Sequence, residues 1–273
     1  MGTEIEIFIS KDANFSEKKA RKSAEKVFRL FRKFEKIFSR FDQNSELCRL
    51  NFAGEKKVSA EFWELLRLAL KMAKKSDGIF NPLVSVASLG YFCDFSAQKF
   101  QKSSPKNLDF SKIKIDEKTR KVFLPKNSEL DFGGCAKGFS VDRAVKILEN
   151  DFENFVISAG GDGFARGAFH GKKWEIAIAD PRDETKNVFF LELENAGFAT
   201  SGNYRRKWEI DGEKFHHLAD GKKNKNRFFA PKSTTVIAPS AVLADILATI
   251  AFFLEPRAAD DFLVKFSATG FSF

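Results

Sequence analysis

The chain has 273 residues, of which 43% are hydrophobic and 30% charged, and its formal net charge is +9. That balance is typical of a globular protein, and the length suffices for a single domain over residues 1–273 or for two closely joined subdomains. We expect no transmembrane segment, because no apolar run approaches about 18 residues, and no nucleic-acid partner, because the lysines are spread over helix faces and loops.

The first half of the chain predicts one strand and two helices. Apolar and polar residues alternate over Glu4–Ser10, which predicts a strand. Over Ser16–Phe38 apolar residues recur every three or four positions, which predicts an amphipathic helix capped by its first serine. A second helix is predicted over Ser59–Lys75, because the dipeptide Asp77-Gly78 gives a helix-end signal. The polar, irregular residues 94–107 are expected to form a surface insertion.

The second half predicts mainly strands, separated by turn signals such as Asp180-Pro181. The predicted strands are Val122–Leu124, Leu130–Phe132, Phe155–Ser158, Trp174–Ala179, Val188–Leu193, Lys207–Ile210 and Thr234–Ile237. Helices are predicted over Gly138–Leu148, over Ala241–Leu254 and near Arg257–Lys265, before a terminal strand. Strands that are grouped together, with flanking helices, indicate an α+β fold.

The segment at residues 130–144 combines an apolar run, three glycines and a lysine. It places bare backbone, the Asp131 carboxylate and the Lys137 ammonium beside the N-terminus of a predicted helix. Backbone N–H groups and the helix dipole at such a position favour anionic groups such as phosphates. The spacing matches neither a Walker loop nor the GxGxxG pattern. A tight strand-to-helix turn without a ligand is the alternative interpretation.

Asp245 and Thr249 lie four residues apart on a predicted helix, so both project from one face. Asp245 stands in an otherwise apolar sequence, where a carboxylate is costly unless it is paired or bound to a cation. One interpretation is an aspartate that caps or pairs locally, with Thr249 bonding back to its own helix. The other is a site for a hard cation, because Mg²⁺ takes oxygen ligands and keeps phosphate and water in its shell.

His217 is the best candidate for a general base among the three histidines of the chain. Imidazole can take a proton from a hydroxyl group near neutral pH. The neighbouring His216 is expected to point to the opposite side of a strand. A structural histidine with satisfied hydrogen bonds is the alternative interpretation of His217.

Eight short segments occur in an order that is specific for one protein family. They are Met1–Thr3, Ser39–Asn51, Gly78–Pro82, Leu130–Ala144, Gly160–Asp162, Thr200–Gly202, His216–Asp220 and Ala244–Thr249. Together they resemble the ApbE-type flavin transferases, which move FMN from FAD onto a threonine of another protein. The resemblance covers nearly the whole chain. It implies an α+β, T-fold-like architecture of mixed, mostly antiparallel sheets with flanking helices.

The resemblance also implies roles for residues of these segments. Asp245, Thr249 and the main-chain carbonyl of Gly134 are expected to bind Mg²⁺, and His217 is expected to act as the base. The residues expected to contact FAD are Met1, Phe41, Ile79, Phe80, Asn81, Asp131 and Lys137. Phe41 stands where relatives often have tyrosine, and core packing is the alternative interpretation of Phe41 and Phe80.

The implied reaction is the Mg²⁺-dependent transfer of FMN from FAD to a threonine hydroxyl of an acceptor flavoprotein, with release of AMP. By the same resemblance, acceptors carry a short Asp-rich motif that ends in Gly-Ala/Ser-Thr. With water as the acceptor, the chain would be an FAD pyrophosphatase that gives FMN and AMP. Without turnover it would be a non-catalytic FAD-binding protein. The sequence does not separate these alternatives.

The chain departs from the family pattern after Asp220. Relatives usually continue with Pro-Arg-Thr-Gly, whereas this chain continues with Gly221, Lys222, Lys223 and Asn224. The departure leaves the shape of this loop and the choice of acceptor open. The basic run at residues 222–227 is the best candidate for a nucleic-acid patch, and attraction of a phosphate-rich substrate is its other interpretation.

The three cysteines and the N-terminus give no targeting or metal-binding signal. Cys48, Cys93 and Cys135 are widely spaced and odd in number, so they form neither a metal motif nor a disulfide framework. We interpret Cys135 as structural. No signal peptide or lipid-attachment cysteine is visible, so a cytoplasmic protein is expected, with export or membrane anchoring as the alternative if an N-terminal segment is missing.

Overall fold

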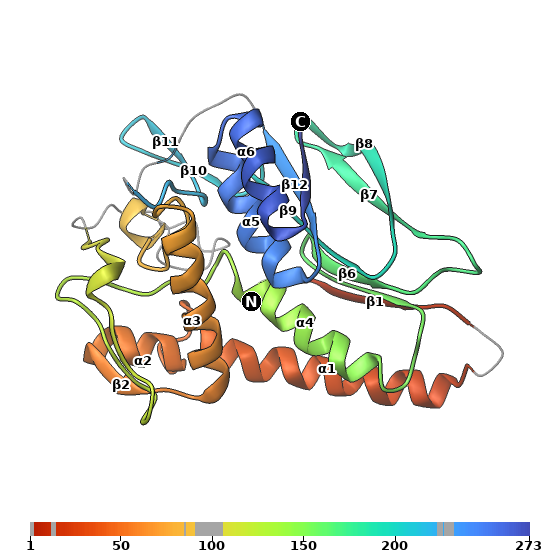
Figure 1. Ribbon diagram of the computed structural model, residues 1–273, viewed down its shortest axis with the longest axis horizontal. Coiled ribbons are helices and arrows are strands. Elements are labelled where there is room, and N and C mark those ends of the chain that lie inside the picture. Colours follow the sequence, from red (N-terminus) through yellow and green to blue (C-terminus); the bar gives the residue numbers. More distant parts are fainter. Residues whose placement is uncertain (1–2, 12–14, 85, 91–105, 223–225, 227–231) are drawn as a thin grey trace. The chain divides into compact units, whose positions relative to one another are not determined.

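The computed structural model describes residues 3–11, 15–84, 86–90, 106–222, 226 and 232–273. The chain divides into two compact units. The first unit comprises Met1–Lys33, Cys135–Gly202 and Pro231–Phe273, and the second comprises Phe34–Gly134 and Asn203–Ala230. Both units combine helices with antiparallel strands (Figure 1).

The first unit is built on an antiparallel sheet with the strand order β1-β5-β6-β9-β12-β13 (Figure 1). Its strands are β1 (Ile5–Ile9), β5 (Phe155–Ala159), β6 (Asp162–Arg166), β9 (Ala196–Gly202), β12 (Ser233–Ala238) and β13 (Thr269–Ser272). A separate hairpin pairs β7 (Trp174–Asp180) with β8 (Asp183–Leu193). The apolar run of β5 is explained by burial of the sheet on both faces.

Helices of the first unit cover one face of this sheet, and the β7–β8 hairpin packs on the other. The helices are α1 (Glu17–Phe38, in this unit up to Lys33), α4 (Ala136–Leu148), α5 (Ala241–Phe253) and α6 (Pro256–Leu263). Phe31 of α1 and Val141 of α4 pack with Ile157 in one core cluster. Val156, the residue before Ile157 on β5, joins Trp174 of the hairpin in another cluster. This alternation is the period-two pattern of a strand.

Helices α4 and α5 meet at Gly138. A Cβ atom added there would lie 2.4 Å from the carbonyl oxygen of Ala241 and 2.7 Å from the Cα of Val242. One turn later, the Asp142 carboxylate accepts hydrogen bonds from the N–H groups of Ala241 (2.8 Å) and Val242 (3.0 Å), which begin α5. Burial raises the pKa of Asp142 to about 6, and these two hydrogen bonds oppose the shift. The crossing therefore holds the start of α5 against α4.

We expect Gly138→Ala to lower the free energy of unfolding by about 1–3 kcal/mol, the usual cost of overpacking a well-packed core. The loss comes from backbone atoms of α5 that the new methyl group would displace. Denaturant unfolding followed by circular dichroism measures it. Lys146→Ala, at an exposed position of the same helix, is the control, and it should change the free energy by less than about 0.5 kcal/mol. An unchanged free energy of unfolding in Gly138→Ala would contradict the close contact between α4 and α5.

The described part of the second unit contains two complete α-helices, a small sheet, a hairpin and the short 3-10 helices Val86–Leu89 and Phe110–Lys112. Its elements are α2 (Glu46–Ala53), α3 (Ala60–Lys75), the antiparallel sheet β2 (Glu55–Lys57), β4 (Lys121–Phe123) and β3 (Lys114–Asp116), and the hairpin β10 (Lys207–Ile210) with β11 (Glu213–His216). Four phenylalanines form an aromatic core, with ring centroids 5.1 to 6.2 Å apart: Phe34, Phe38, Phe62 and Phe132. Trp208 and Phe215 stack across the hairpin at 6.0 Å.

Most of the predicted elements are confirmed within a few residues, but the strand at Leu130–Phe132 is wrong. This segment has no regular secondary structure. The Leu130 N–H donates to the side chain of Asn51 (2.8 Å), and the Asp131 N–H donates to the carbonyl of Pro82 (2.8 Å). The helix predicted from Gly138 begins at Ala136. Strands β2, β3, β6, β9 and β11 and helix α2 were not predicted.

Three further expectations concern the surface insertion, the cysteines and transmembrane segments. Cys93 and most of the predicted insertion at residues 94–107 lie outside them. Cys135 is buried at the start of α4, as expected of a structural residue, and Cys48 is partly buried. Within the part of the chain that the structure describes, no helix is long and apolar enough to cross a membrane.

Candidate active site

Lys137 lies between two carboxylates in the first unit. Its ammonium contacts the carboxylate of Asp162 and lies 3.5 Å from Oδ2 of Asp245. Both carboxylates are buried, since Asp162 is 2% and Asp245 4% exposed. We call these three residues the acid–lysine cluster. Burial and the neighbouring Asp245 raise the pKa of Asp162 to about 8, while Lys137 opposes this shift.

A glycine turn places Asp162 in the cluster. Gly160 and Gly161, between β5 and β6, have φ angles of 63° and 96°, which glycine adopts most readily. A Cβ atom on Gly160 would lie 1.8 Å from Oγ1 of Thr3, so a larger residue would have to displace the Thr3 side chain as well as adopt a strained φ. Asp162 is the first residue of β6 and pairs with Ala159 across the turn. The strand pairing therefore fixes the backbone position from which the Asp162 carboxylate projects.

Helix α5 positions Asp245 and Thr249. Oδ2 of Asp245 accepts a hydrogen bond from the N–H of Gly138 (3.1 Å). The Thr249 hydroxyl lies 3.2 Å from the hydroxyl of Ser201 and donates to the main-chain oxygen of Asp245 (3.3 Å). Asp245 is thus paired locally and Thr249 bonds back to its own helix, which is one of the two interpretations left open by the sequence. It does not exclude a cation, since carboxylate and hydroxyl oxygens remain the ligands that Mg²⁺ takes.

The predicted metal ligands do not form a conventional acidic cluster. Among the described residues, no group of three or more His, Cys, Asp or Glu side chains is arranged to hold a metal ion. The expected set contains one carboxylate, one hydroxyl and one main-chain carbonyl, so it is not of that kind. Asp245 and Thr249 belong to the first unit, whereas Gly134 ends a segment of the second, directly before Cys135. The Gly134 contact stays a prediction. The buried Asp245 carboxylate and the Thr249 hydroxyl are oxygen ligands of the kind that a hard cation takes.

In the second unit, Arg40 links two residues that were expected to contact FAD. Oδ1 of Asp131 accepts a hydrogen bond from the N–H of Gly133 (2.7 Å), and its Oδ2 lies 3.7 Å from Nε of Arg40. The Arg40 guanidinium lies over the Phe41 ring, 4.5 Å from its centroid. Phe41 is only partly buried and packs against the Trp208 cluster. Both of its predicted roles, core packing and flavin contact, are compatible with this position.

The Asn81 side chain holds its own turn together. Its Nδ2 donates to the carbonyls of Leu108 (2.9 Å) and Gly221 (3.1 Å), and its Oδ1 accepts from the Leu83 N–H (2.9 Å). Phe80 is 6% exposed, which favours its alternative interpretation as a core residue. The half-buried Ile79 is accessible to a ligand. The FAD contacts of these three residues stay predictions, and Met1 lies outside the described residues.

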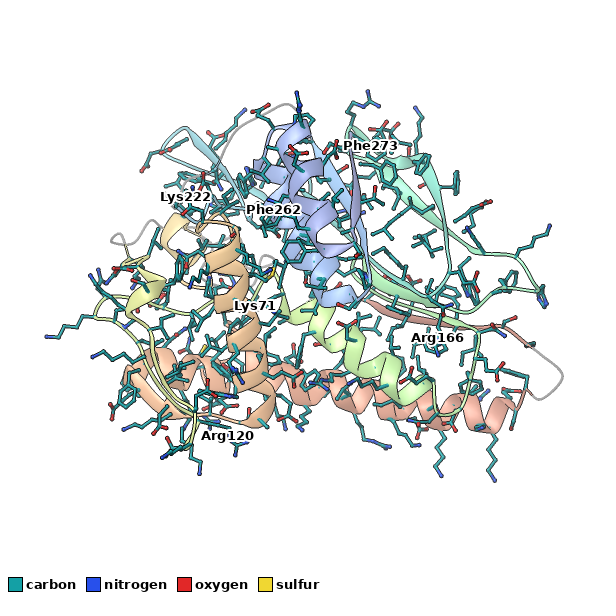
Figure 2. All side chains as sticks on the ribbon, in the orientation of Figure 1. Lys71, Arg120, Arg166, Lys222, Phe262 and Phe273 are labelled. Carbon is teal, nitrogen blue, oxygen red and sulfur yellow. The ribbon has the colours of Figure 1, made fainter. Side chains whose placement is uncertain are left out.

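The loop that departs from the family pattern is anchored to this turn. The Gly221 N–H donates to the carbonyl of Ile79 (3.0 Å). A Cβ atom on Gly221 would lie 2.3 Å from the carbonyl oxygen of Gly78, so the turn requires a glycine here. Nζ of Lys222, labelled in Figure 2, lies 2.6 Å from Oδ2 of Asp77. Of the basic run that follows, only Asn226 is described beyond Lys222.

The adjacent histidines differ in burial. His216 ends β11, is fully buried and accepts a hydrogen bond from the Leu218 N–H at Nδ1 (3.2 Å). His217 follows the strand, is only partly buried, and donates its main-chain N–H to Arg206 (3.2 Å). Its Nδ1 atom is buried, so a substrate could meet only the exposed part of this residue. The role of His217 as the base stays a prediction.

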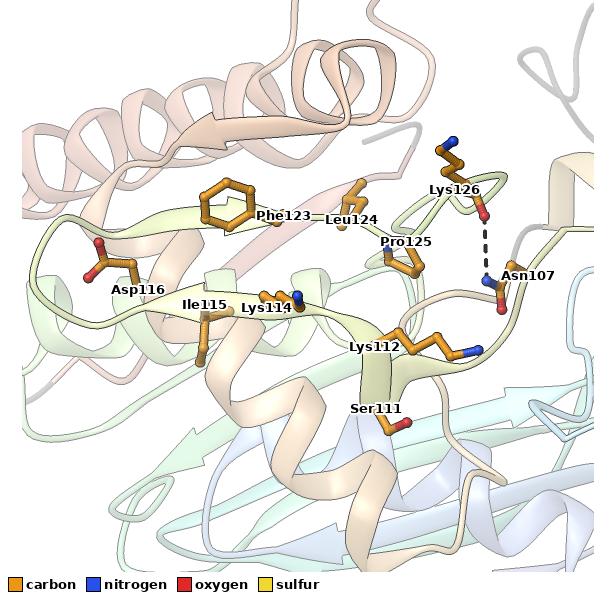
Figure 3. A pocket seen from close by; sticks show the side chains of 10 residues that line it. All are labelled: Asn107, Ser111, Lys112, Lys114, Ile115, Asp116, Phe123, Leu124, Pro125 and Lys126. Atoms are coloured by element: carbon orange, nitrogen blue, oxygen red, sulfur yellow. Dashed lines mark hydrogen bonds between the residues drawn. The ribbon is translucent and has the colours of Figure 1, made fainter.

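A cavity of about 820 Å³ lies elsewhere in the second unit, along β3 and β4 (Figure 3). Lys112, Lys114 and Lys126 line it together with Phe123 and Pro125. It contains none of the residues predicted to bind FAD or the metal. Its size alone does not make it the active site.

The match to known proteins identifies the family. The model of the ApbE family matches residues 1–270, and the chain belongs to this family. The FAD:protein FMN transferase of Haemophilus influenzae is 28% identical over 253 residues, which are 85% of this chain and 72% of that relative. The FAD:protein FMN transferase of Treponema pallidum is 28% identical over 255 residues, which are 84% of this chain and 70% of that relative.

Solved structures show the same fold. The ApbE protein of Thermotoga maritima has a TM-score of 0.83 and 24% identity, with 98% of this chain and 93% of that chain covered. The flavin transferase ApbE of Vibrio cholerae has a TM-score of 0.78 and 21% identity, with 99% and 89% covered. The predicted α+β class of mostly antiparallel sheets is confirmed, and the chain is a homologue of enzymes that transfer FMN from FAD to proteins.

Asp162, Arg40 and Ser201 were not predicted to belong to the site. Each lies within one of the family segments, but its sequence context gave it no role. The signal for Asp162 is its place after two glycines at the start of an apolar strand, where a carboxylate is expected to be buried and therefore paired.

Proposed function

We propose that this chain transfers FMN from FAD to a threonine hydroxyl of an acceptor flavoprotein, with release of AMP and with Mg²⁺ as its metal. The observation that carries the proposal is the acid–lysine cluster with Thr249, in a member of a flavin transferase family. A partly exposed ammonium beside two buried carboxylates and a hydroxyl suits both a diphosphate and a hard cation.

The residues of the chain divide the work as follows. Asp245, Thr249 and the Gly134 carbonyl would hold Mg²⁺, which supplies positive charge to the FAD diphosphate when bound. Lys137 orients a phosphate oxygen. His217 takes the proton of the acceptor threonine, and the hydroxyl oxygen attacks the FMN-side phosphorus. The bond between this phosphorus and the bridging oxygen breaks, so AMP leaves and FMN stays attached through a phosphoester.

The experiment combines the purified protein with FAD, Mg²⁺ and an acceptor domain that bears the threonine motif. The acceptor is then weighed by intact-protein mass spectrometry. We expect a gain of one FMN that disappears when EDTA is present. Free FMN and AMP with an unmodified acceptor would replace the proposal by FAD hydrolysis. Intact FAD with bound flavin absorbance would replace it by flavin binding without turnover.

A further inference from the structure

We propose that Asp142 is a positioning residue for the cation site, because its carboxylate fixes where helix α5 begins and thereby where α5 holds Asp245 and Thr249. The inference rests on the proposed function only in taking these two side chains as cation ligands. Neither the family resemblance nor the sequence pattern assigned Asp142 a role, although it lies within the segment at residues 130–144.

Both oxygens of the Asp142 carboxylate bind the start of α5. Oδ1 accepts a hydrogen bond from the Ala241 N–H (2.8 Å), and Oδ2 accepts one from the Val242 N–H (3.0 Å). These two donors are consecutive residues, which are separated by about 100° around the axis of a helix. A carboxylate that binds both donors therefore resists rotation of α5 as well as its movement along the axis.

Helix α5 does not need Asp142 for an ordinary cap. Its N-cap is Ser240, whose hydroxyl oxygen accepts a hydrogen bond from the Leu243 N–H (3.4 Å). Asp142 adds a contact from another helix, across 99 positions of the chain. Burial raises the pKa of Asp142 to about 6, so its surroundings disfavour the ionised form, and the two hydrogen bonds oppose this shift. A carboxylate that is kept at such a place indicates a task beyond starting the helix.

The position of the helix start determines the position of the cation ligands. Asp245 and Thr249 follow Ala241 at intervals of four residues, so all three lie along one side of α5. Helix α4 holds this side at a second point, since the Gly138 N–H donates to Oδ2 of Asp245 (3.1 Å). Gly138 and Asp142 are one turn apart on α4. Without the Asp142 contact only one of these points remains, and α5 can shift about it.

Cation selectivity separates a positioning role from a merely structural one. Mg²⁺ requires nearly ideal octahedral geometry with ligands at about 2.0–2.1 Å, whereas Ca²⁺ accepts flexible geometry at about 2.3–2.6 Å. A small displacement of Asp245 and Thr249 should therefore weaken the binding of Mg²⁺ more than the binding of Ca²⁺. A loss of stability alone would lower both affinities by the same factor, because it acts through the fraction of folded protein.

The test titrates Mg²⁺ and Ca²⁺ against bound Mn²⁺, without FAD or acceptor, and follows free Mn²⁺ by electron paramagnetic resonance. Mn²⁺ takes oxygen ligands of the same kind. In Asp142→Asn the side chain keeps its size, but its NH₂ group would face one of the two N–H donors. We expect the ratio of Mg²⁺ affinity to Ca²⁺ affinity to fall about tenfold, the lower end of the range for residues that support metal ligands.

The second variant, Asp142→Glu, keeps the charge but lengthens the side chain by one methylene group. The carboxylate or the start of α5 must then move, so the affinity ratio should fall here too. If the negative charge of Asp142 mattered and its position did not, this variant would keep the ratio of the unmodified protein.

The matched control is Ser240→Ala, which removes the cap of α5 but leaves both Asp142 contacts in place. It should lower the denaturant midpoint of unfolding and leave the affinity ratio unchanged. Circular dichroism checks that each variant is folded. The inference is overturned by an unchanged ratio in either Asp142 variant, by an equal fall in Ser240→Ala, or by an unmodified protein that does not bind Mn²⁺. If the ratios change as expected but no acceptor gains FMN, only the proposed function fails.

Discussion

Asp245→Asn is expected to abolish metal-dependent FMN transfer while leaving the fold intact. The amide still offers an oxygen to the Gly138 N–H, which now donates to the carboxylate at 3.1 Å. It removes the negative charge that a cation requires. The rate should fall by about 100-fold or more, because a bound cation supplies several kcal/mol of charge stabilisation and about 1.4 kcal/mol is a factor of ten in rate. Mass spectrometry of the acceptor against time measures the rate.

The control for this substitution is Asp151→Asn, because Asp151 is a carboxylate of the same unit that pairs with Lys19 at 3.3 Å, outside the acid–lysine cluster. This variant should transfer FMN at the unmodified rate. Denaturant unfolding of both variants separates loss of the site from loss of the fold. Transfer at the unmodified rate by Asp245→Asn, with the same dependence on Mg²⁺, would remove Asp245 from the metal site.

His217→Ala is expected to bind FAD normally and to transfer FMN about 100-fold to 10,000-fold more slowly, the usual contribution of a general base. The threonine hydroxyl is a poor nucleophile until its proton is taken. The side chain follows β11 and is partly exposed, so its removal leaves the buried His216 and its hydrogen bond in place. FAD binding is measured by flavin fluorescence, and transfer by mass spectrometry.

Added imidazole should restore part of the activity of His217→Ala, because it fills the space with the missing base. His170→Asn is the control, since His170 is exposed and has a φ angle of 49° that asparagine tolerates. It should transfer FMN normally. A His217→Ala protein that transfers as fast as the unmodified one would place the base elsewhere in the chain.

The elements that could be predicted from the sequence are those with a clear period. The amphipathic pattern of α1 and the Asp77-Gly78 end signal of α3 gave their bounds to within a residue, and β1 alternates as expected. Strands β6 and β9 were missed because glycine and alanine interrupt their apolar patterns, and the sheet context decides their conformation. Leu130–Phe132 looked like a strand because its pattern is apolar, but Asn51 and Pro82 take its hydrogen bonds.

The candidate site was predicted in its residue types but not in its contacts. Family resemblance singled out Asp245, Thr249 and Lys137, and the structure brings these three into one unit. The sequence could not show that Lys137 faces Asp162, because that contact depends on the turn at Gly160 and on the packing of α4. It also could not show that the Asn81 amide is occupied by its own turn.

The acid–lysine cluster is assembled from distant parts of the chain. Lys137 and Asp162 are 25 positions apart, and the Gly138 N–H reaches Asp245 across 107 positions. Contacts of such long range form late in folding, because the intervening chain must first be ordered. A chain that is still folding has the carboxylates but not their arrangement. Cation affinity would therefore appear only with completed tertiary structure, so the ion would stabilise the finished protein without guiding its early folding.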